Sequence, residues 1–278
     1  MIFETTGDSA YRVRRTLLTS KVRLILDEPQ NGFRNMAADE ILFNTAAHNG
    51  DQPVTLRVYR WSRPTITLGR RQNFSVVDFD VCRKYGVDFV KRFGGGAAVY
   101  HWEEITYCFV ARLDFLPSIM DSDLWRKLFI VFLERLGITP DDSAPRRKNA
   151  GRAEKKSANC FSAAQRDEPT INGRKWVGNA RRKSKTVFLQ HGSILMNPQP
   201  TFLQKIAPGM KKDISAGLCE LSPGLCAEKA EKAFVDTVEF IFGLSFSEVG
   251  YTRHEQIIMN RLEDIKRCEF AKTMASAC

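Results

Sequence analysis

Short segments in which apolar and polar residues alternate, or in which apolar residues cluster, predict β-strands along much of the chain. The predicted strands cover residues 22–26, 54–61, 65–69, 87–93, 103–113 and 185–196. The pair Asn172–Gly173 is a strong hairpin signal and joins two more short segments, 168–173 and 174–180.

Other segments carry the apolar spacing and the end signals of α-helices. These predicted helices cover residues 31–47, 78–86, 121–137, 227–243 and 252–268. The helix at 121–137 has the clearest signals, an Asp/Ser cap and a terminating Gly137. The last helix starts with a capping box formed by Thr252 and Glu255.

Strands mostly precede helices without strict alternation, which favours a mixed, largely antiparallel sheet with flanking helices. We therefore predict an α/β fold of the α+β type rather than a doubly wound parallel sheet. The predicted organisation is an N-terminal extension at 1–21, one catalytic domain at 22–267 that is helical from about 227, and a frayed tail at 268–278.

The 278 residues are 43% hydrophobic, enough to bury a sizeable core. No run of apolar residues is long enough to span a membrane, and the N-terminus lacks a secretory signal. The seven cysteines are odd in number, irregularly spaced and without a CxxC pair. This pattern argues against a disulfide framework or a zinc site and favours the cytoplasm.

The net charge of +10 comes from two stretches, 146–156 and 174–185, and the rest of the chain is nearly neutral. Such concentrated charge attracts an anionic partner, whether nucleic acid, a nucleotide, a phosphopantetheine arm or an acidic protein. The alternative is that both stretches are solvated loops.

Three polar features are candidates for a site. Residues 94–96 are three glycines after a predicted strand, but they match neither a P-loop nor a dinucleotide fingerprint, so a plain strand connection is the alternative. His101 stands near Glu103 and Glu104, without a second histidine at metal-ligand spacing, which favours a hydrogen-bonding role. His191 interrupts an apolar strand and either lines a pocket or is a satisfied core histidine.

Cys160 lies between the two basic stretches, and nearby cations lower the pKa of a thiol and make it a better nucleophile. Lys175 follows after the predicted chain reversal and is a candidate for proton transfer beside it. The alternative is an inert buried cysteine.

Four blocks in this order resemble the lipoate-protein ligase and octanoyltransferase family: "NGFRNMAADEILF", "LRVYRWSRPTITLGRRQNF", "KRFGGGAAVYHWEEITYCFV" and "INGRKWVGNARRK…VFLQHGSILM". The resemblance covers residues 22–267 and implies a fold related to biotin ligases and class II aminoacyl-tRNA synthetase cores. "HWEEITY", "LQHGSI" and the spacing of "CF" to the lysine of "NGRK" are most similar to LipM-type octanoyltransferases.

The resemblance implies that Cys160 is the acyl-accepting nucleophile and that Lys175 binds the acyl carbonyl and assists proton transfer. It also implies an acyl pocket shaped by Arg92, Gly95, Gly96, His101, Gly178, Ala180, His191 and Gly192. The sequence departs from the family pattern at Ala97, Asn159 and Arg181.

The activity so implied is transfer of an octanoyl group from acyl carrier protein to a lysine of a lipoyl carrier domain, such as glycine cleavage H protein or a dehydrogenase E2 domain. It needs no metal, cofactor, nucleic acid or membrane. One alternative is an ATP-dependent lipoate ligase that works through an acyl-adenylate. The other is a non-catalytic relative that binds nucleic acid. The basic stretches weigh against it, because Trp176 is the only aromatic residue in 146–156 and 174–185.

Overall fold

The computed structural model describes residues 22–48, 52–141, 167–206 and 215–276. The strands are β1 (Val22–Leu26), β2 (Val54–Tyr59), β3 (Thr65–Leu68), β4 (Asp88–Lys91), β5 (Val99–His101), β6 (Glu104–Arg112), β7 (Val177–Lys183), β8 (Val187–Leu195) and β9 (Phe246–Glu248). The helices are α1 (Gly32–Ala46), α2 (Phe79–Tyr85), α3 (Ser122–Arg135), α4 (Leu203–Ile206), α5 (Leu218–Leu221), α6 (Ala227–Phe242) and α7 (Arg253–Ala275), with 3₁₀ turns η2 (Phe74–Val76) and η3 (Pro117–Met120).

The strands form two sheets. The larger has the order β7-β8-β6-β2-β1-β9, and the smaller has the order β4-β3-β5. In the larger sheet β7, β8, β6 and β2 pair antiparallel, whereas β1 runs parallel to both β2 and β9. The prediction of a mixed, largely antiparallel sheet with flanking helices is confirmed.

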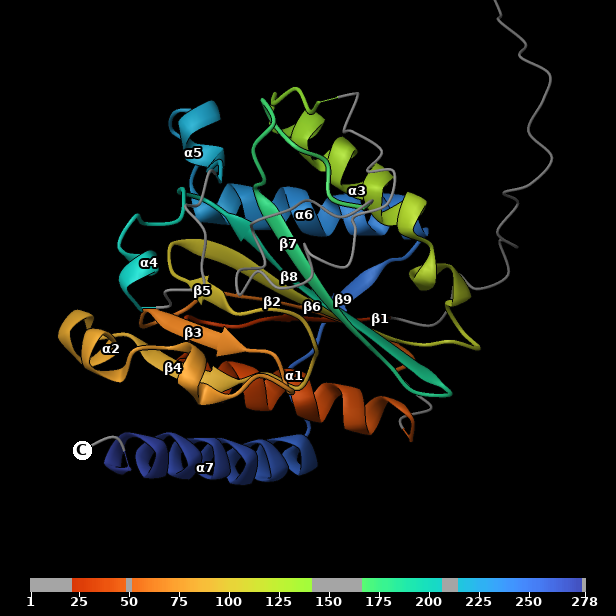
Figure 1. Ribbon diagram of the computed structural model, residues 1–278. Helices are drawn as coiled ribbons and strands as arrows, with labels where there is room; N and C mark the ends of the chain where they lie inside the picture. Colours follow the sequence, from red (N-terminus) through yellow and green to blue (C-terminus); the bar gives the residue numbers. More distant parts are fainter. Residues whose placement is uncertain (1–21, 49–51, 142–166, 207–214, 277–278) are drawn as a thin grey trace, which may run out of the picture.

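Helices cover both faces of the larger sheet (Figure 1). Because side chains alternate along a strand, Leu56 and Val58 of β2 join the core under α3 and α6, while Tyr59 joins the core against α1. The smaller sheet lies beside α1, and α7 lies on the outer side of both (Figure 1). The α1 side of the larger sheet therefore faces a second layer of structure, and the pocket described below forms there.

The end of α7 corrects one prediction. The tail expected at 268–278 is helical over most of its length, because α7 continues to Ala275, and residues 277 and 278 lie outside the described residues. Phe270 packs its ring against Phe33 of α1 and Phe89 of β4, with ring centroids 5.4 and 4.7 Å apart. These aromatic contacts bridge two layers and hold the last turns of the helix in place.

The predicted hairpin is present but short. Asn172 and Gly173 have φ values of 51° and 71°, the left-handed pair that a two-residue turn requires. Ile171 and Arg174 pair across this turn as an isolated bridge. The strand that follows begins only at Val177 and pairs with β8, so the two predicted arms pair with each other only at the turn.

In the part of the chain that the structure describes, no helix is both long and apolar enough to cross a membrane.

Candidate functional site

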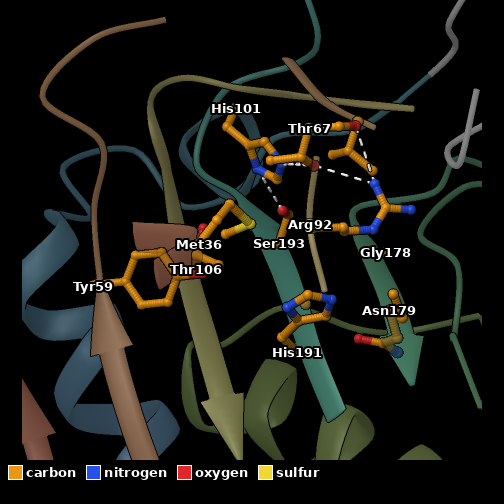
Figure 2. Close-up of a pocket in the computed structure, with 13 residues that line it drawn as sticks. Met36, Tyr59, Thr67, Arg92, His101, Thr106, Gly178, Asn179, His191 and Ser193 are labelled. Atoms are coloured by element: carbon orange, nitrogen blue, oxygen red, sulfur yellow. Dashed lines mark hydrogen bonds between the residues drawn. The ribbon is translucent and has the colours of Figure 1, made fainter. Parts of the chain in front are cut away.

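A pocket opens where the smaller sheet and α1 meet the larger sheet (Figure 2). Strands from both sheets and helix α1 contribute its walls. The lining residues are Met36, Tyr59, Thr67, Arg92, Val99, His101, Thr106, Gly178, Asn179, Ala180, His191, Gly192 and Ser193. Six of the residues implied by the family resemblance thus line one cavity: Arg92, His101, Gly178, Ala180, His191 and Gly192.

His101 is held by hydrogen bonds on both ring nitrogens. Its Nε2 lies 2.7 Å from Thr67 Oγ1, and its Nδ1 lies 2.7 Å from Glu104 Oε1 and 3.1 Å from Ser193 Oγ. Its ring also stacks on Trp61 with centroids 4.1 Å apart. The predicted hydrogen-bonding role of His101 is confirmed, and these contacts fix the orientation of its ring in the pocket wall.

Burial lowers the pKa of His101, although the carboxylate of Glu104 acts in the opposite direction. The folded protein therefore keeps His101 neutral where an unfolded chain protonates it, below about pH 6.5. Since the unfolded state then binds more protons, the free energy of unfolding is expected to fall as the pH decreases from 7 to 5.5, by at most about 1.4 kcal/mol per pH unit for one proton. Urea unfolding at several pH values measures this slope.

His101→Asn is expected to reduce that slope, whatever it does to stability at pH 7. The control is His48→Asn, the same substitution at an exposed position. An unchanged slope in His101→Asn would show that His101 is not the cause of this pH dependence.

His191 is placed by a buried ionic cluster beneath the pocket. Its Nδ1 lies 3.0 Å from Asp39 Oδ2, which also accepts a hydrogen bond from the Tyr59 hydroxyl at 3.0 Å. Asp39 Oδ1 in turn pairs with Arg57 Nη1 at 2.8 Å. Burial opposes ionisation of Asp39, but the hydrogen bond to His191 and the charge of Arg57 outweigh it and hold the pKa of Asp39 below its usual value. The orientation of His191 is therefore set by a charged carboxylate.

The glycine loop is hydrogen-bonded to Arg92. The Arg92 guanidinium donates to the carbonyls of Thr67, Gly95 and Ala97 at 2.6–3.0 Å. Gly96 has a φ of 95°, which favours glycine. Arg92 lines the described pocket, whereas Gly95 and Gly96 do not, so the role implied for the two glycines stays a prediction.

Lys175 is buried and forms an ion pair with Glu168, with Nζ 2.7 Å from Oε2. Lys175 lies outside the lining of the pocket, but Glu168 Oε1 accepts a hydrogen bond from the backbone N–H of Asn179, which is a lining residue. The ion pair thus lies directly behind the pocket wall formed by β7. Cys160 and the basic stretch 146–156 fall outside the described residues, so the proposed pairing of Cys160 with Lys175 stays a prediction.

The second basic stretch, 174–185, is largely engaged within the protein. Arg174 pairs with Glu220, and Arg181 pairs with Asp167. Arg182 lies over the ring of Phe93, 3.5 Å from its centroid. With Lys175 also paired, only part of this positive charge is available to an outside partner.

Several site residues were missed from the sequence, among them Tyr59, Thr67, Asn179 and Asp39. One signal was available for Asp39, which falls between Met36 and Phe43 at helical spacing and therefore on the apolar face of α1. A carboxylate on a buried helix face needs a partner, and that need pointed to a buried polar cluster.

A family model described as the lipoyl protein ligase A/B catalytic domain matches residues 31–227. Octanoyltransferase LipM of Moorella thermoacetica is 39% identical over 179 residues, which cover 63% of this chain and 64%, less than two thirds, of that protein. Octanoyltransferase LipM of Clostridioides difficile is 29% identical over 269 residues, which cover 90% of this chain and 98% of that protein.

Two solved structures have a similar fold. A lipoate-protein ligase A bound with ATP superposes with a TM-score of 0.70 at 20% identity, over 88% of this chain and 94% of that one. A bi-partite lipoate protein ligase of Thermoplasma acidophilum superposes with a TM-score of 0.65 at 22% identity, over 88% of this chain and 92% of that one. The family match covers most of the chain, and the protein therefore belongs to the lipoyl protein ligase A/B catalytic-domain family.

Proposed function

We propose that this protein is an octanoyltransferase of lipoate biosynthesis. It takes an octanoyl group from the thioester of acyl carrier protein and delivers it to a lysine of a lipoyl carrier domain. The observation that carries the proposal is the similarity to octanoyltransferase LipM of Clostridioides difficile along nearly the whole length of both chains. The presence of Cys160 and Lys175 at the spacing of that branch supports it.

The transfer proceeds in two steps with a covalent intermediate. In the first, the Cys160 thiolate attacks the carbonyl carbon of the octanoyl thioester, and the carrier sulfur leaves as a thiolate, which takes up the proton that Cys160 lost. In the second, the lysine amine of the acceptor domain attacks the acyl-enzyme, forms an amide and releases the Cys160 thiol. Thioester exchange is nearly thermoneutral and amide formation is downhill, so the sequence of steps needs no ATP.

The pocket supports this proposal because it combines apolar and polar walls. Met36 and Val99 offer apolar surface to an acyl chain, whereas His101, Asn179 and His191 lie among the polar residues of the lining. Such a mixture is typical of a site that holds an apolar substrate and orients a reacting carbonyl group.

The experiment is acylation without nucleotide. The protein is incubated with octanoyl-acyl carrier protein, and its intact mass is measured before and after addition of a lipoyl carrier domain. We expect a gain of one octanoyl group, which then moves to the carrier domain. A carrier domain whose acceptor lysine is replaced by arginine is the control and should leave the acyl-enzyme charged.

Other results would overturn the proposal. Acylation of the carrier domain only with ATP and a free acid would make the protein a ligase. RNA binding that falls steeply with salt, without any acylated protein, would make it a nucleic-acid-binding relative.

A further inference from the structure

The Nε2 atom of His191 stands apart from the other polar side-chain atoms of the pocket. It is buried, and no described residue offers it a hydrogen-bond partner. The other polar lining side chains each have a hydrogen-bond partner within the protein: Tyr59, Thr67, Arg92, His101, Thr106, Asn179 and Ser193. A buried polar atom without a partner is rare in folded proteins, and a catalytic role is one of the explanations for it.

The hydrogen bond on the opposite side of the ring decides what Nε2 offers. Asp39 is ionised and can only accept, so the Nδ1 of His191 carries the proton that forms their 3.0 Å hydrogen bond. In the neutral imidazole Nε2 then presents its lone pair to the pocket. Tyr59 and Arg57 fix the carboxylate, so this tautomer is built into the fold.

Gly94 keeps the approach to Nε2 open. A methyl group at this position would stand 3.0 Å from the Nε2 atom and 3.6 Å from Cε1 of the same ring. The absence of a side chain at Gly94 therefore leaves space beside the lone pair. This gives the first glycine of the loop a function that the hydrogen bonds of Arg92 to Gly95 and Ala97 do not explain.

We propose that His191 is the general base that deprotonates the acceptor lysine, and that Asp39 is the residue that positions it. The inference rests on the proposed octanoyl transfer. The ammonium group of the acceptor gives one proton to His191 Nε2, and the resulting amine attacks the Cys160 thioester. The C–N bond forms and the C–S bond breaks, a second nitrogen proton goes to the departing thiolate, and the proton on His191 returns to solvent as the amide product leaves.

The two other candidate bases of the site are less suited to this step. His101 has both ring nitrogens occupied by hydrogen bonds to Thr67 and Glu104. Lys175 lies outside the pocket lining in an ion pair with Glu168, and an ammonium group has no lone pair to offer. His191 thus fits the acceptor half of the reaction, and Lys175 stays with the acyl carbonyl, as the family resemblance implies.

Measuring the two half-reactions separately distinguishes a role of His191 as general base from a structural role. His191→Asn keeps an amide N–H near the position of Nδ1, facing Asp39, but it removes Nε2. Formation of the acyl-enzyme, followed by intact mass in rapid-quench samples, is expected to slow at least about tenfold less than transfer to the carrier domain. Transfer to a lipoyl carrier domain in a single turnover is expected to slow by about 10²- to 10³-fold. His254→Asn, at an exposed histidine, is the control and should change neither step.

A nucleophile that needs no deprotonation gives the sharpest comparison. Hydroxylamine is already neutral at pH 7, so it should discharge the acyl-enzyme of His191→Asn at the rate of the parent protein.

Two more variants keep the imidazole of His191 and test its surroundings. Asp39→Asn should place the proton on Nε2, and Gly94→Ala should crowd that atom. Both should slow transfer to the carrier domain while leaving discharge by hydroxylamine unchanged.

The results that would overturn the inference are distinct from those that would overturn the proposed function. No acyl-enzyme in the parent protein contradicts octanoyl transfer itself. If the acyl-enzyme forms but His191→Asn slows both half-reactions equally, or slows hydroxylamine as much as the carrier lysine, His191 shapes the pocket and is not the base. Thermal unfolding of each variant verifies that the fold is retained.

Discussion

Cys160→Ala is expected to abolish octanoyl transfer, lowering the rate by more than about 10⁴-fold, and to remove the acyl mass from the intact protein. The reason is that the acyl group then has no thiolate to accept it. Cys160→Ser tests the same point, because a hydroxyl group in place of the thiol ionises far less readily. An octanoyl adduct that persists on Cys160→Ala would identify another residue as the nucleophile.

The cysteines in the part of the chain that the structure describes strengthen the expectation that Cys160 is the nucleophile. Burial raises the pKa of Cys82 to about 12 and raises that of Cys108 well above its ordinary value, so both are poor nucleophiles at neutral pH. Cys226 and Cys268 are exposed, and no described cysteine lines the pocket. Cys226→Ala is therefore the matched control and should transfer octanoate at the rate of the parent protein.

Lys175→Met is expected to reduce the transfer rate by about 10²- to 10⁴-fold, because the acyl carbonyl and the proton transfer lose their cationic partner. The same change removes the cation beside the fully buried carboxylate of Glu168, and breaking such a pair costs about 3–5 kcal/mol of folding free energy. Urea unfolding measures the second effect, and single-turnover kinetics measure the first.

A double variant separates the two effects. Lys175→Met combined with Glu168→Gln removes both charges and should recover most of the stability, but it should not recover the activity. The pair Lys232–Asp236 on α6 has similar geometry, 2.9 Å, but is exposed, so Lys232→Met should cost less than about 0.5 kcal/mol. If activity returned together with stability in the double variant, Lys175 would act only through the fold.

Local patterns predicted the elements well because most of the signals lie within one element. The helix at 31–47 and the capping box at Thr252 and Glu255 depend on residues three and four apart, and the structure contains both. The frayed tail was mispredicted because its order depends on Phe270 meeting Phe33 and Phe89, which are far away in the sequence.

The site was predictable only in part, because its contacts join residues that are far apart in the sequence. Sequence blocks indicated His101 and His191 alike. Only the packing of strands and helix α1 shows that His101 is hydrogen-bonded to Thr67 and Glu104, and that His191 is held by Asp39. The charge of 174–185 likewise suggested a docking surface, whereas several of its cations pair with distant acidic residues such as Glu220.

The position of α7 has a consequence for synthesis of the protein on the ribosome. Strand β1, near the start of the described chain, pairs with β9, and α1 is covered by α7, so the C-terminal elements complete the layers begun by the N-terminal ones. A nascent chain that ends before residue 246 exposes one edge of β1 and the outer face of α1. The fold therefore closes only after β9 and α7 have been synthesised, and until then these surfaces are available to chaperones and to other nascent chains.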